Sequence, residues 1–579
     1  MKLIHKLLLI AFVLGFAACQ DLTKLDGLQD NPNAVSPDKA GINFLYNQIQ
    51  LSFNGFFGDT RGLSASVARE LALQATNYSG FGAPSAYDGI WQRAYSTLFP
   101  DMDACIEIAE ASDLKYYSGT VKVMKAYVMM CLVDLFGDVT YSEAGQGTDI
   151  ISPKVDPGKD VYAAALVLLD EGITDLSGGA NAPTSANDFF YNGNSAKWTT
   201  LAKTLKLRAY VTTRLVDTNA KGAITNLIQG GDLIDQASED FQFTYGTNRT
   251  NPNTRHPFYN NWYETSDGDY MSNYYMWLLR GEKRVDGDPI IDPRIRFYFY
   301  RQDIDLTDEN VDVWGCQFSQ TPVRSAAPAH YLALDPDMPY CITSEDGYFG
   351  RDHGNGSGIP PDGNVRTAYG IYPGGGRWDD DSAELVQESG TLGALGKGIN
   401  PIMLSSFVDF MRAEAALTVQ TGEDARALLQ SGIEKSFAKV IDGSRALIPH
   451  LSQVAFTDFQ GNDVTYEKAY FPTEDDRTNY INFVLDEYDN AASESAKLNI
   501  IMKEYLIALW GNGIEAYNNY RRTGKPEKAQ PMLEASATDY PRSALYPSVL
   551  VNRNANVAQK ANRAVQVFWD TNPATGFVY

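Results

Sequence analysis

Apolar side chains recur at helical spacing along several long segments, and this pattern restricts the possible folds more than any other feature of the sequence. The stretch from Asp101 to Phe136 has one apolar helical face. Similar faces follow Ser195, extend from Ile402 to about Lys439 with a break at Thr421-Gly422, and run from about Ser495 to Tyr520. The pattern predicts a mainly helical chain built from antiparallel helix pairs.

Helix pairs of this kind must stack, because a single pair cannot bury its apolar face alone. Such stacking is typical of tetratricopeptide-like repeats, although the sequence shows no clean repeat of roughly 34 residues. The first helix is expected at Ser36, since Ser36-Pro37-Asp38 supplies an N-cap hydroxyl, a proline at the first helical position and an early acid. We therefore predict one helical domain over residues 36–579.

The first residues have the layout of a secretory signal peptide. Lys2 and Lys6 precede an apolar run, Leu7 to Phe16, that is too short to cross a bilayer comfortably. Ala17, Ala18 and Cys19 then resemble a bacterial lipobox, although Phe16 stands where leucine is usual. We predict a signal peptide over residues 1–18, an acylated Cys19, and a flexible tether over residues 19–35. The alternative is an ordinary signal peptide with a chance cysteine at its end.

The charge of the chain argues against two classes of partner. Lys and Arg number 48 against 72 Asp and Glu, which gives a formal net charge of −24 and opposes binding to nucleic acid or to an anionic membrane surface. A neutral cargo fits better. No other stretch of eighteen apolar residues occurs, so no further membrane span is expected.

The remaining four cysteines match no zinc-binding spacing. Cys105 and Cys131 lie in helical patterns and are expected to be buried as small hydrophobic residues. Cys316 and Cys341 lie in a loop-rich stretch, and an exported location allows them to form a disulfide.

Residues 232–400 form a long region that helical periodicity does not explain. Its first part holds eight aromatic residues mixed with Asn and Asp: Phe258, Tyr259, Trp262, Tyr263, Tyr270, Tyr274, Tyr275 and Trp277. Its second part, from Cys341 to Asn400, has fourteen glycines in sixty residues. Long loops in a compact protein are often functional, so this region is the predicted ligand face.

Sequence signals for catalysis are weak. The five histidines contain no HExxH pair, and neither a GxSxG elbow nor a GxxxxGK[ST] loop is present. Glycoside hydrolysis needs only two suitably spaced carboxylates, so a secreted glycoside hydrolase stays open as an alternative. Asp379, Asp380 and Asp381, with Asp352 and Asp362, are weak candidates for a cation site, but a solvated acidic turn is the favoured interpretation.

The C-terminal sequence is more specific. The run IIMKEYLIALWGNGIEAYNNYRRTGKP, followed by YPRSALYP and VNRNANV, closely resembles the C-terminal signature of the SusD/RagB-like family of outer-membrane lipoproteins. NPNAVSPDKA, WTTLAKTLKLRAYVTTRL, DPRIRFYFYRQ and FMRAEAALTVQTG resemble the same family. The resemblance covers essentially the whole mature chain.

The resemblance implies a scaffold of tetratricopeptide-like helix pairs whose long loops form a ligand site. It also implies a non-enzymatic lipoprotein without a cofactor, anchored through Cys19 at the surface of the outer membrane. Members of the family cap a SusC-like TonB-dependent barrel transporter and deliver oligosaccharides, or in some members peptides, into it. A glycan is the preferred cargo here and an oligopeptide the alternative. The arginines of RRTG and DPRI are interpreted as structural, capping carbonyls or pairing with acids between helices.

Sugar sites place aromatic faces beside Asn, Asp and Arg groups that bind hydroxyls. Three segments have that mixture, although for any one aromatic residue burial in the core is the more common outcome. The predicted ligand contacts are, in order of preference, Trp262 and Tyr263 with Asn260 and Asn261, then Tyr372 and Trp378 around a glycine turn, then Asn77 and Tyr78 in an early loop. Trp91, on a helical pattern, is expected in the core.

Overall fold

The computed structural model describes most of the chain from residue 41 onward. The described residues are 41–180, 187–265, 268–304, 327–341, 346–356, 366–386, 389–535, 539–573 and 576–577. The predicted signal peptide, Cys19, the tether and the predicted helix start at Ser36 lie outside them. The described part of the first long helix begins at Ile42.

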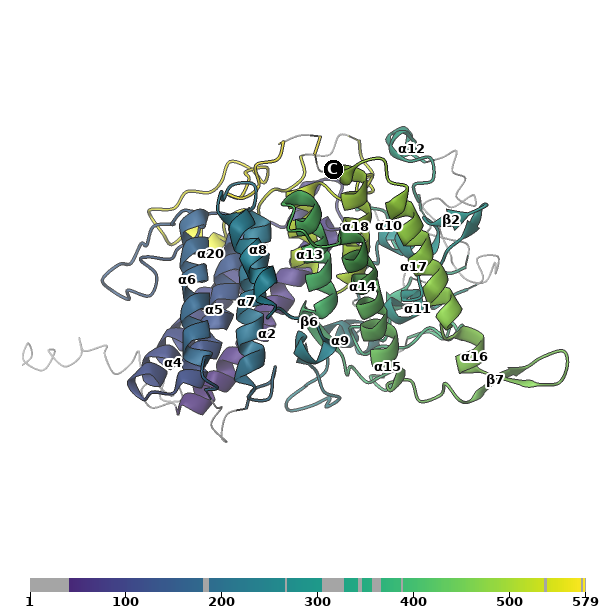
Figure 1. Ribbon diagram of the computed structural model, residues 1–579, viewed down its shortest axis with the longest axis horizontal. Helices are drawn as coiled ribbons and strands as arrows, with labels where there is room; N and C mark the ends of the chain where they lie inside the picture. Colours follow the sequence, from purple (N-terminus) through teal and green to yellow (C-terminus); the bar gives the residue numbers. More distant parts are fainter. Residues whose placement is uncertain are drawn as a thin grey trace, which may run out of the picture.

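Long helices stand side by side in two groups (Figure 1). The N-terminal group consists of α2 (Ile42–Val67), α4 (Phe99–Ala111), α5 (Lys115–Phe136), α6 (Gly158–Leu176), α7 (Ser195–Thr213) and α8 (Ala220–Gly230). The C-terminal group consists of α13 (Ser405–Thr418), α14 (Ala425–Phe437), α17 (Glu474–Asp489), α18 (Glu494–Ala508) and α19 (Gly513–Thr523). Neighbours along the chain pack as pairs, as with α5 and α6 or α13 and α14, and the groups meet where α7 contacts α13 and α19 contacts α2. The predicted mainly helical fold of helix pairs is confirmed.

Helix boundaries follow local signals in the sequence. Asn194 accepts a hydrogen bond from the Lys197 backbone at the start of α7, and Thr473 and Asp476 form a capping box at the start of α17. Gly422, with φ of 87°, stands between α13 and α14, where a break was predicted. Two expectations need correction. The stretch 101–136 is divided between α4 and α5, and the block from Ser495 to Tyr520 is divided between α18 and α19.

Short helices connect and flank the two groups. They are η2 (Tyr78–Phe81), η3 (Pro84–Tyr87), α3 (Asp88–Gln92), the π-helix η4 (Arg93–Leu98), η5 (Ala237–Glu239), α9 (Pro257–Tyr263), α10 (Asn273–Arg280), α11 (Ile295–Tyr298), α12 (Ala329–Leu334), the π-helix η7 (Ala438–Asp442), α15 (Gly443–Arg445), α16 (Tyr466–Tyr470) and α20 (Ser548–Val551).

The strands of the described residues form four antiparallel pairs and no larger sheet. They are β1 (Phe241–Thr244) with β6 (Ile399–Met403), β2 (Arg284–Val285) with β3 (Asp288–Pro289), β4 (Phe299–Tyr300) with β5 (Ala368–Tyr369), and β7 (Val454–Thr457) with β8 (Asp463–Thr465). Ile402, predicted to begin a helix, lies in β6 instead. Its strand partner is distant in sequence, so local periodicity carries no sign of the pairing.

Glycine allows the closest helix contacts. On α5, a Cβ at Gly119 would lie 2.6 Å from Leu176 Cγ, and on α6, one at Gly172 would lie 3.1 Å from the carbonyl oxygen of Gly119. The two backbones can approach this closely only because both positions lack a side chain. Burial of the apolar faces in such contacts gives the fold most of its stability.

The arginines of the C-terminal signature bind other helices, as predicted. Arg521 donates to the carbonyl oxygens of Asp134 (2.7 Å) and Arg542 (2.6 Å), and Arg522 donates to both carboxylate oxygens of Glu414 (2.8 and 2.6 Å). In DPRI, Arg294 pairs with Asp292 at 2.6 Å in the core. Arg521 therefore joins the two helical groups, and Arg522 and Arg294 make buried ion pairs within the protein.

Cys105 and Cys131 are buried and free, which confirms the prediction for them. Cys341 is disulfide-bonded. Cys316 lies outside the described residues, so the pairing of these two cysteines stays a prediction. Among the described residues no helix is long and apolar enough to cross a bilayer.

Candidate functional site

Two segments with predicted site residues, the early loop and the aromatic segment, lie beside residues 351–354 of the glycine-rich stretch, although the three are distant in sequence. The backbone N–H of Ala72 donates to the carbonyl oxygen of Tyr270 at 2.9 Å, and that of Arg351 donates to Met271 at 2.9 Å. Gly354 donates to the carbonyl oxygen of Leu73 at 3.0 Å. The early loop, the aromatic segment and the first glycine-rich segment therefore meet at one place.

A stack of aromatic rings and guanidinium groups lies at this meeting point. The guanidinium carbon of Arg351 is 3.7 Å from the centroid of the Tyr270 ring. That of Arg366 is 4.5 Å from the Tyr270 ring and 4.6 Å from the Trp262 ring. Cation–π contacts of this length are attractive, so the four side chains order one another. We call Trp262, Asp269, Tyr270, Arg351 and Arg366 the Tyr270 cluster.

The exposure and charge of the Tyr270 cluster suit a polar ligand. Tyr270, Arg351, Arg366 and Asp269 are each half-buried, so they are held in place yet reachable. Asp269 accepts a hydrogen bond from the Tyr369 hydroxyl at 3.2 Å. Burial raises the pKa of Asp269 above its ordinary value, against the opposing effects of Tyr369 and Arg366. The cluster thus combines cationic donors, a carboxyl group and a ring edge.

The segment FYNNWY, expected within an irregular region, forms the short helix α9. His256 caps it, because its Nδ1 accepts a hydrogen bond from the Phe258 backbone at 3.0 Å. Consecutive helical residues point in different directions. Asn261 is therefore exposed and Asn260 half-buried, whereas Trp262 and Tyr263 are buried.

The two leading aromatic candidates differ in their surroundings. Trp262 is 2% exposed beneath Arg366 and against Gly268, but its Nε1 makes no hydrogen bond to any described residue. Asn260 Oδ1, two residues earlier, is likewise buried without a partner among them. Tyr263, by contrast, is fully engaged: its hydroxyl donates to Tyr369 and accepts from the Arg377 backbone. The ligand contacts proposed for all four residues of this segment stay predictions.

Tyr372 and Trp378 are buried, and neither takes part in the ring contacts that define the Tyr270 cluster. Tyr372 packs near Tyr298, and Trp378 packs against Phe297, Phe471 and His450. The glycine turn between them packs on the protein's own backbone. A Cβ at Gly376 would lie 2.6 Å from the carbonyl oxygen of Tyr369, for example. These glycines were predicted to let the backbone approach a ligand closely. In the structure they let it approach another part of the same chain.

The two predicted ligand contacts of the early loop, Asn77 and Tyr78, differ in how accessible they are. Asn77 caps η2 by accepting a hydrogen bond from the Ser79 backbone at 2.8 Å and stays half-buried. Tyr78 is 2% exposed, and its hydroxyl accepts from Arg69 at 3.3 Å and lies 3.2 Å from His353 Nε2. Asn77 is therefore the more accessible of the two. Trp91 is buried in α3, as predicted.

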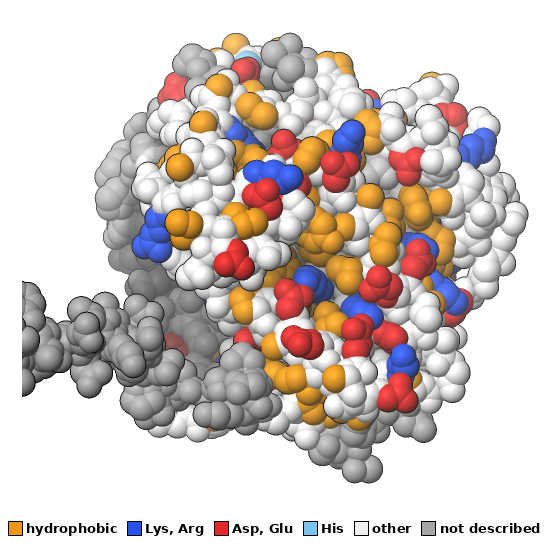
Figure 2. Space-filling view, turned by 90° about the vertical axis from the view of Figure 1, so that its left-hand side faces the viewer, with side chains coloured by type: hydrophobic (Ala, Val, Ile, Leu, Met, Phe, Trp, Pro, Cys, Tyr) orange, Lys and Arg blue, Asp and Glu red, His pale blue; other side chains and the backbone are white. Residues whose placement is uncertain are grey.

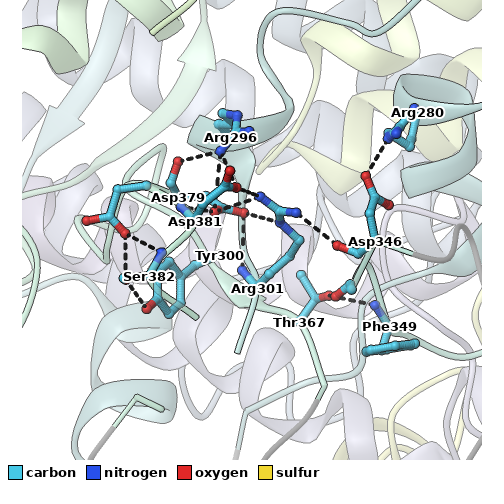
Figure 3. A network of polar contacts seen from close by, with 12 residues as sticks. Arg280, Arg296, Tyr300, Arg301, Asp346, Phe349, Thr367, Asp379, Asp381 and Ser382 are labelled. Atoms are coloured by element: carbon cyan, nitrogen blue, oxygen red, sulfur yellow. Dashed lines mark hydrogen bonds and ion pairs between the residues drawn. The ribbon is translucent and has the colours of Figure 1, made fainter. Parts of the chain in front are cut away.

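The acidic run Asp379 to Asp381 is not the solvated turn that we expected (Figure 3). Arg301 points at it from the position just after β4, and its Nε lies 2.7 Å from Asp379 Oδ2. Arg296 Nη1 lies 2.7 Å from Asp381 Oδ1, and His450 Nε2 lies 3.2 Å from Asp380 Oδ2. Asp379 is completely buried. Two arginines pair with Asp379 and Asp381, and they were not foreseen because both precede the run by many residues.

This compensation leaves the run poorly suited to hold a cation. Within the described ranges, no group of three or more His, Cys, Asp or Glu side chains is arranged to hold a metal ion. Asp352, proposed alongside the run, is buried elsewhere and accepts hydrogen bonds from Asn273 (3.1 Å) and Gln530 (2.9 Å). Asp362 lies outside those ranges.

Arg351 and Arg366 are the candidate site residues that the sequence did not indicate. Both flank the glycine-rich stretch GNGSGIPPDGN, and both positions were visible as basic residues in a loop-rich segment. Nothing local marks them as partners of Tyr270 and Trp262.

Comparisons with known proteins identify relatives over most of the chain. A family model described as "Starch-binding associating with outer membrane" matches residues 33–328, and one described as "Susd and RagB outer membrane lipoprotein" matches residues 397–571. No curated protein matches the chain.

Solved structures share the fold at low sequence identity. A SusD homologue from Bacteroides uniformis is 20% identical, with a TM-score of 0.61 over 92% of this chain and 99% of its own. A chitin-binding SusD homologue from Flavobacterium johnsoniae is 18% identical, with a TM-score of 0.60 and the same coverage. A SusD/RagB family protein from Bacteroides thetaiotaomicron is 17% identical, with a TM-score of 0.61 over 92% of this chain and 100% of its own.

Proposed function

The chain belongs to the SusD and RagB family of outer-membrane lipoproteins, and on that premise we propose that it binds oligosaccharides or polysaccharide fragments and delivers them to a SusC-like TonB-dependent barrel transporter. Family members are binding proteins without catalysis. The glycoside hydrolase alternative is therefore withdrawn. An oligopeptide cargo is the remaining competitor.

One observation carries the proposal: the Tyr270 cluster gathers half-buried aromatic and guanidinium groups where three loops meet. Guanidinium and amide groups donate to sugar hydroxyls, and the rim of the Tyr270 ring, whose face the guanidinium groups cover, lies beside these donors. Asn260 Oδ1 and Trp262 Nε1 lie on the adjoining helix without partners among the described residues. They offer an acceptor and a donor to a bound hydroxyl.

Cargo identity is proposed from the relatives by analogy. The matching family model is named for starch, and one similar structure is of a chitin-binding protein. Malto-oligosaccharides and chito-oligosaccharides are therefore the first ligands to examine. A peptide would be held chiefly through its backbone amides, which Asn and Arg side chains also bind.

Calorimetric titration of the purified full chain with malto-oligosaccharides, chito-oligosaccharides and mixed oligopeptides tests the proposal. We expect heat from at least one glycan and no steady release of reducing ends. Tyr270→Ala should remove that heat, whereas Phe459→Ala, which removes an exposed aromatic ring from the β7–β8 hairpin, should preserve it. Heat from peptides alone would replace the glycan cargo with a peptide.

The transporter partner is tested by co-purification. Delivery into a barrel requires that the lipoprotein stay close to it, and we place the lipid on Cys19 with residues 19–35 as a tether. A tagged SusC-like barrel transporter from the same cells should co-purify the chain from detergent extracts. Absence of the chain from such extracts would contradict the proposed partner.

A further inference from the structure

A cavity of about 520 Å³ opens in the N-terminal helical group. Residues of η4, α4, α5, α6 and the segment 139–146 line it, and none of them belongs to the Tyr270 cluster. Its volume lies in the range of about 300 to 1,000 Å³ that is typical of small-molecule sites. Figure 2 looks onto the end of the molecule where α4 and α6 lie, and shows hydrophobic side chains gathered across it between acidic and basic groups.

One wall of this cavity is aromatic and rigid. The Tyr95 ring stacks on Trp91 at 4.3 Å and meets the Phe99 ring edge-on at 5.2 Å. The Tyr95 hydroxyl donates to the carbonyl oxygen of Thr140 at 2.6 Å, which fixes the ring against the segment opposite. Tyr95 lies in the π-helix η4, and π-helical turns are frequent at functional sites.

The mouth of the cavity is also held in place. Asp156 accepts hydrogen bonds from the backbones of Tyr141 (2.9 Å) and Ser142 (2.7 Å) and from the Ser142 hydroxyl (2.7 Å). A backbone bridge joins Asp156 to Val139. The backbone of Tyr141, a residue that is 38% exposed, is therefore held in place, so little backbone ordering is needed when a ligand binds.

Polar groups accompany the aromatic wall. Thr140 is 5% exposed, and its Oγ1 makes no hydrogen bond to any described residue. A buried hydroxyl without a partner is unfavourable, and a ligand hydroxyl would satisfy it. Lys125 lies over the Phe99 ring at 5.7 Å and forms an ion pair with Asp103, so the lining carries both signs of charge.

We propose that this cavity is a second glycan-binding site, which takes one compact, uncharged sugar unit. Aromatic faces beside a buried hydroxyl suit a pyranose ring, and the paired charges favour neither an anion nor a cation. The inference rests on the proposed function, because it assumes a glycan ligand. Two sites on one chain hold a polymer more tightly than either holds a short fragment.

The test counts sites with short ligands and measures avidity with polymers. The full chain is titrated with maltohexaose and chitohexaose, and its binding to starch and chitin is compared. We expect two sites per wild-type chain for the hexamer that binds. Tyr141→Ala should leave one site and weaken polymer binding at least about tenfold, since avidity commonly contributes 10²-fold or more. Phe459→Ala is the matched control, because it removes another exposed aromatic ring, and should change neither quantity.

Thr140→Val separates binding from folding. The substitution keeps the shape of the side chain and removes only the hydroxyl, so it should raise or preserve the melting temperature while weakening the second site. Tyr270→Ala should remove the site at the Tyr270 cluster and retain the site in the cavity.

Each other outcome has a defined meaning. One wild-type site that Tyr270→Ala abolishes, with Tyr141→Ala and Thr140→Val unchanged, would overturn the second site and leave the proposed function intact. One site that Tyr141→Ala abolishes and Tyr270→Ala spares would support the cavity and displace the Tyr270 cluster. Binding of no glycan by the wild-type chain would overturn both proposals.

Discussion

The guanidinium of Arg351 lies 3.7 Å from the centroid of the Tyr270 ring, closer than any other half-buried cation–π contact in the candidate site. Arg366 covers the same ring at 4.5 Å. A ligand therefore meets the edges of the guanidinium groups together with the rim of the ring. Recognition at this place should depend on hydrogen bonds as much as on stacking.

Tyr270→Ala should weaken glycan binding about tenfold or more, because it removes the ring that orders both arginines; tenfold corresponds to about 1.4 kcal/mol. Its side chain is half-buried, so the melting temperature should change little. Calorimetry and thermal unfolding of the same samples measure the two effects. A large loss of stability with unchanged affinity would make Tyr270 a structural residue.

Trp262→Ala should behave differently. Its indole is 2% exposed, and truncating a buried tryptophan commonly costs about 3 to 5 kcal/mol of unfolding free energy. We expect urea unfolding to show a clearly lower free energy of unfolding. Glycan binding should also weaken, because Arg366 loses one of the two rings that it covers. A stable Trp262→Ala variant with lost binding would show that the indole turns toward the ligand.

How much of the fold the sequence predicts depends on whether the signal is local. Helical periodicity and Gly422 identified α7, α13 and α14 because both act within a few residues. Ile402 was assigned to a helix and lies in a strand, since its pairing with β1 is a long-range event. The arginines of RRTG were correctly interpreted as structural because their motif lies on a long buried helix.

The candidate site was predicted only in part, for the same reason. The early loop and the aromatic segment were identified by composition and do meet, but the glycine-rich residues beside them are 351–354 and not the predicted turn with Tyr372 and Trp378. Which ring is reachable depends on α9, whose helical turn buries Trp262 and exposes Asn261. Arg351 and Arg366 have no local signature, because their role comes from Tyr270 and Trp262 in another segment.

Breaking the buried pair between Arg542 and Asp570 should be strongly destabilising. Both side chains are fully buried, and Arg542 Nε donates to Asp570 Oδ2 at 2.5 Å. Arg542→Met leaves an uncompensated carboxylate in the core, for which about 3 to 5 kcal/mol is typical. The double variant Arg542→Met/Asp570→Leu should recover most of that loss, as urea unfolding can measure. No recovery would show that packing of the guanidinium, rather than charge, accounts for the effect.

Because of Lys560, the free energy of unfolding should vary with pH in the alkaline range. Burial lowers the pKa of Lys560 to about 7, with Asp138 opposing and Arg521 adding to the shift. Between about pH 7 and the ordinary value of 10.5, the unfolded chain binds a proton that the folded chain does not. Stability from this group therefore rises with pH across that window and is lowest below it.

Lys560→Met should remove this slope. The difference in unfolding free energy between wild type and variant, measured by urea unfolding at several pH values across the window, isolates Lys560 from other titrating groups. Parallel curves for the two proteins would contradict the lowered pKa. Loss of the hydrogen bonds to Ser543 and Ala544 shifts the variant curve without changing its slope with pH.

Cys19→Ala should release the protein from the outer membrane without changing its ligand affinity. The family is one of outer-membrane lipoproteins, and Cys19 follows two alanines at the end of an apolar segment. Acyl chains on one residue give stable anchoring, whereas the acidic body has no other attraction to an anionic surface. Cell fractionation should therefore find the variant in soluble fractions, and calorimetry should find unchanged glycan binding. Cys105→Ala, which alters a buried free cysteine, serves as the control and should stay with the membrane. If Cys19→Ala stays on cells that have the barrel transporter and leaves cells that lack it, contact with that partner alone is sufficient for retention.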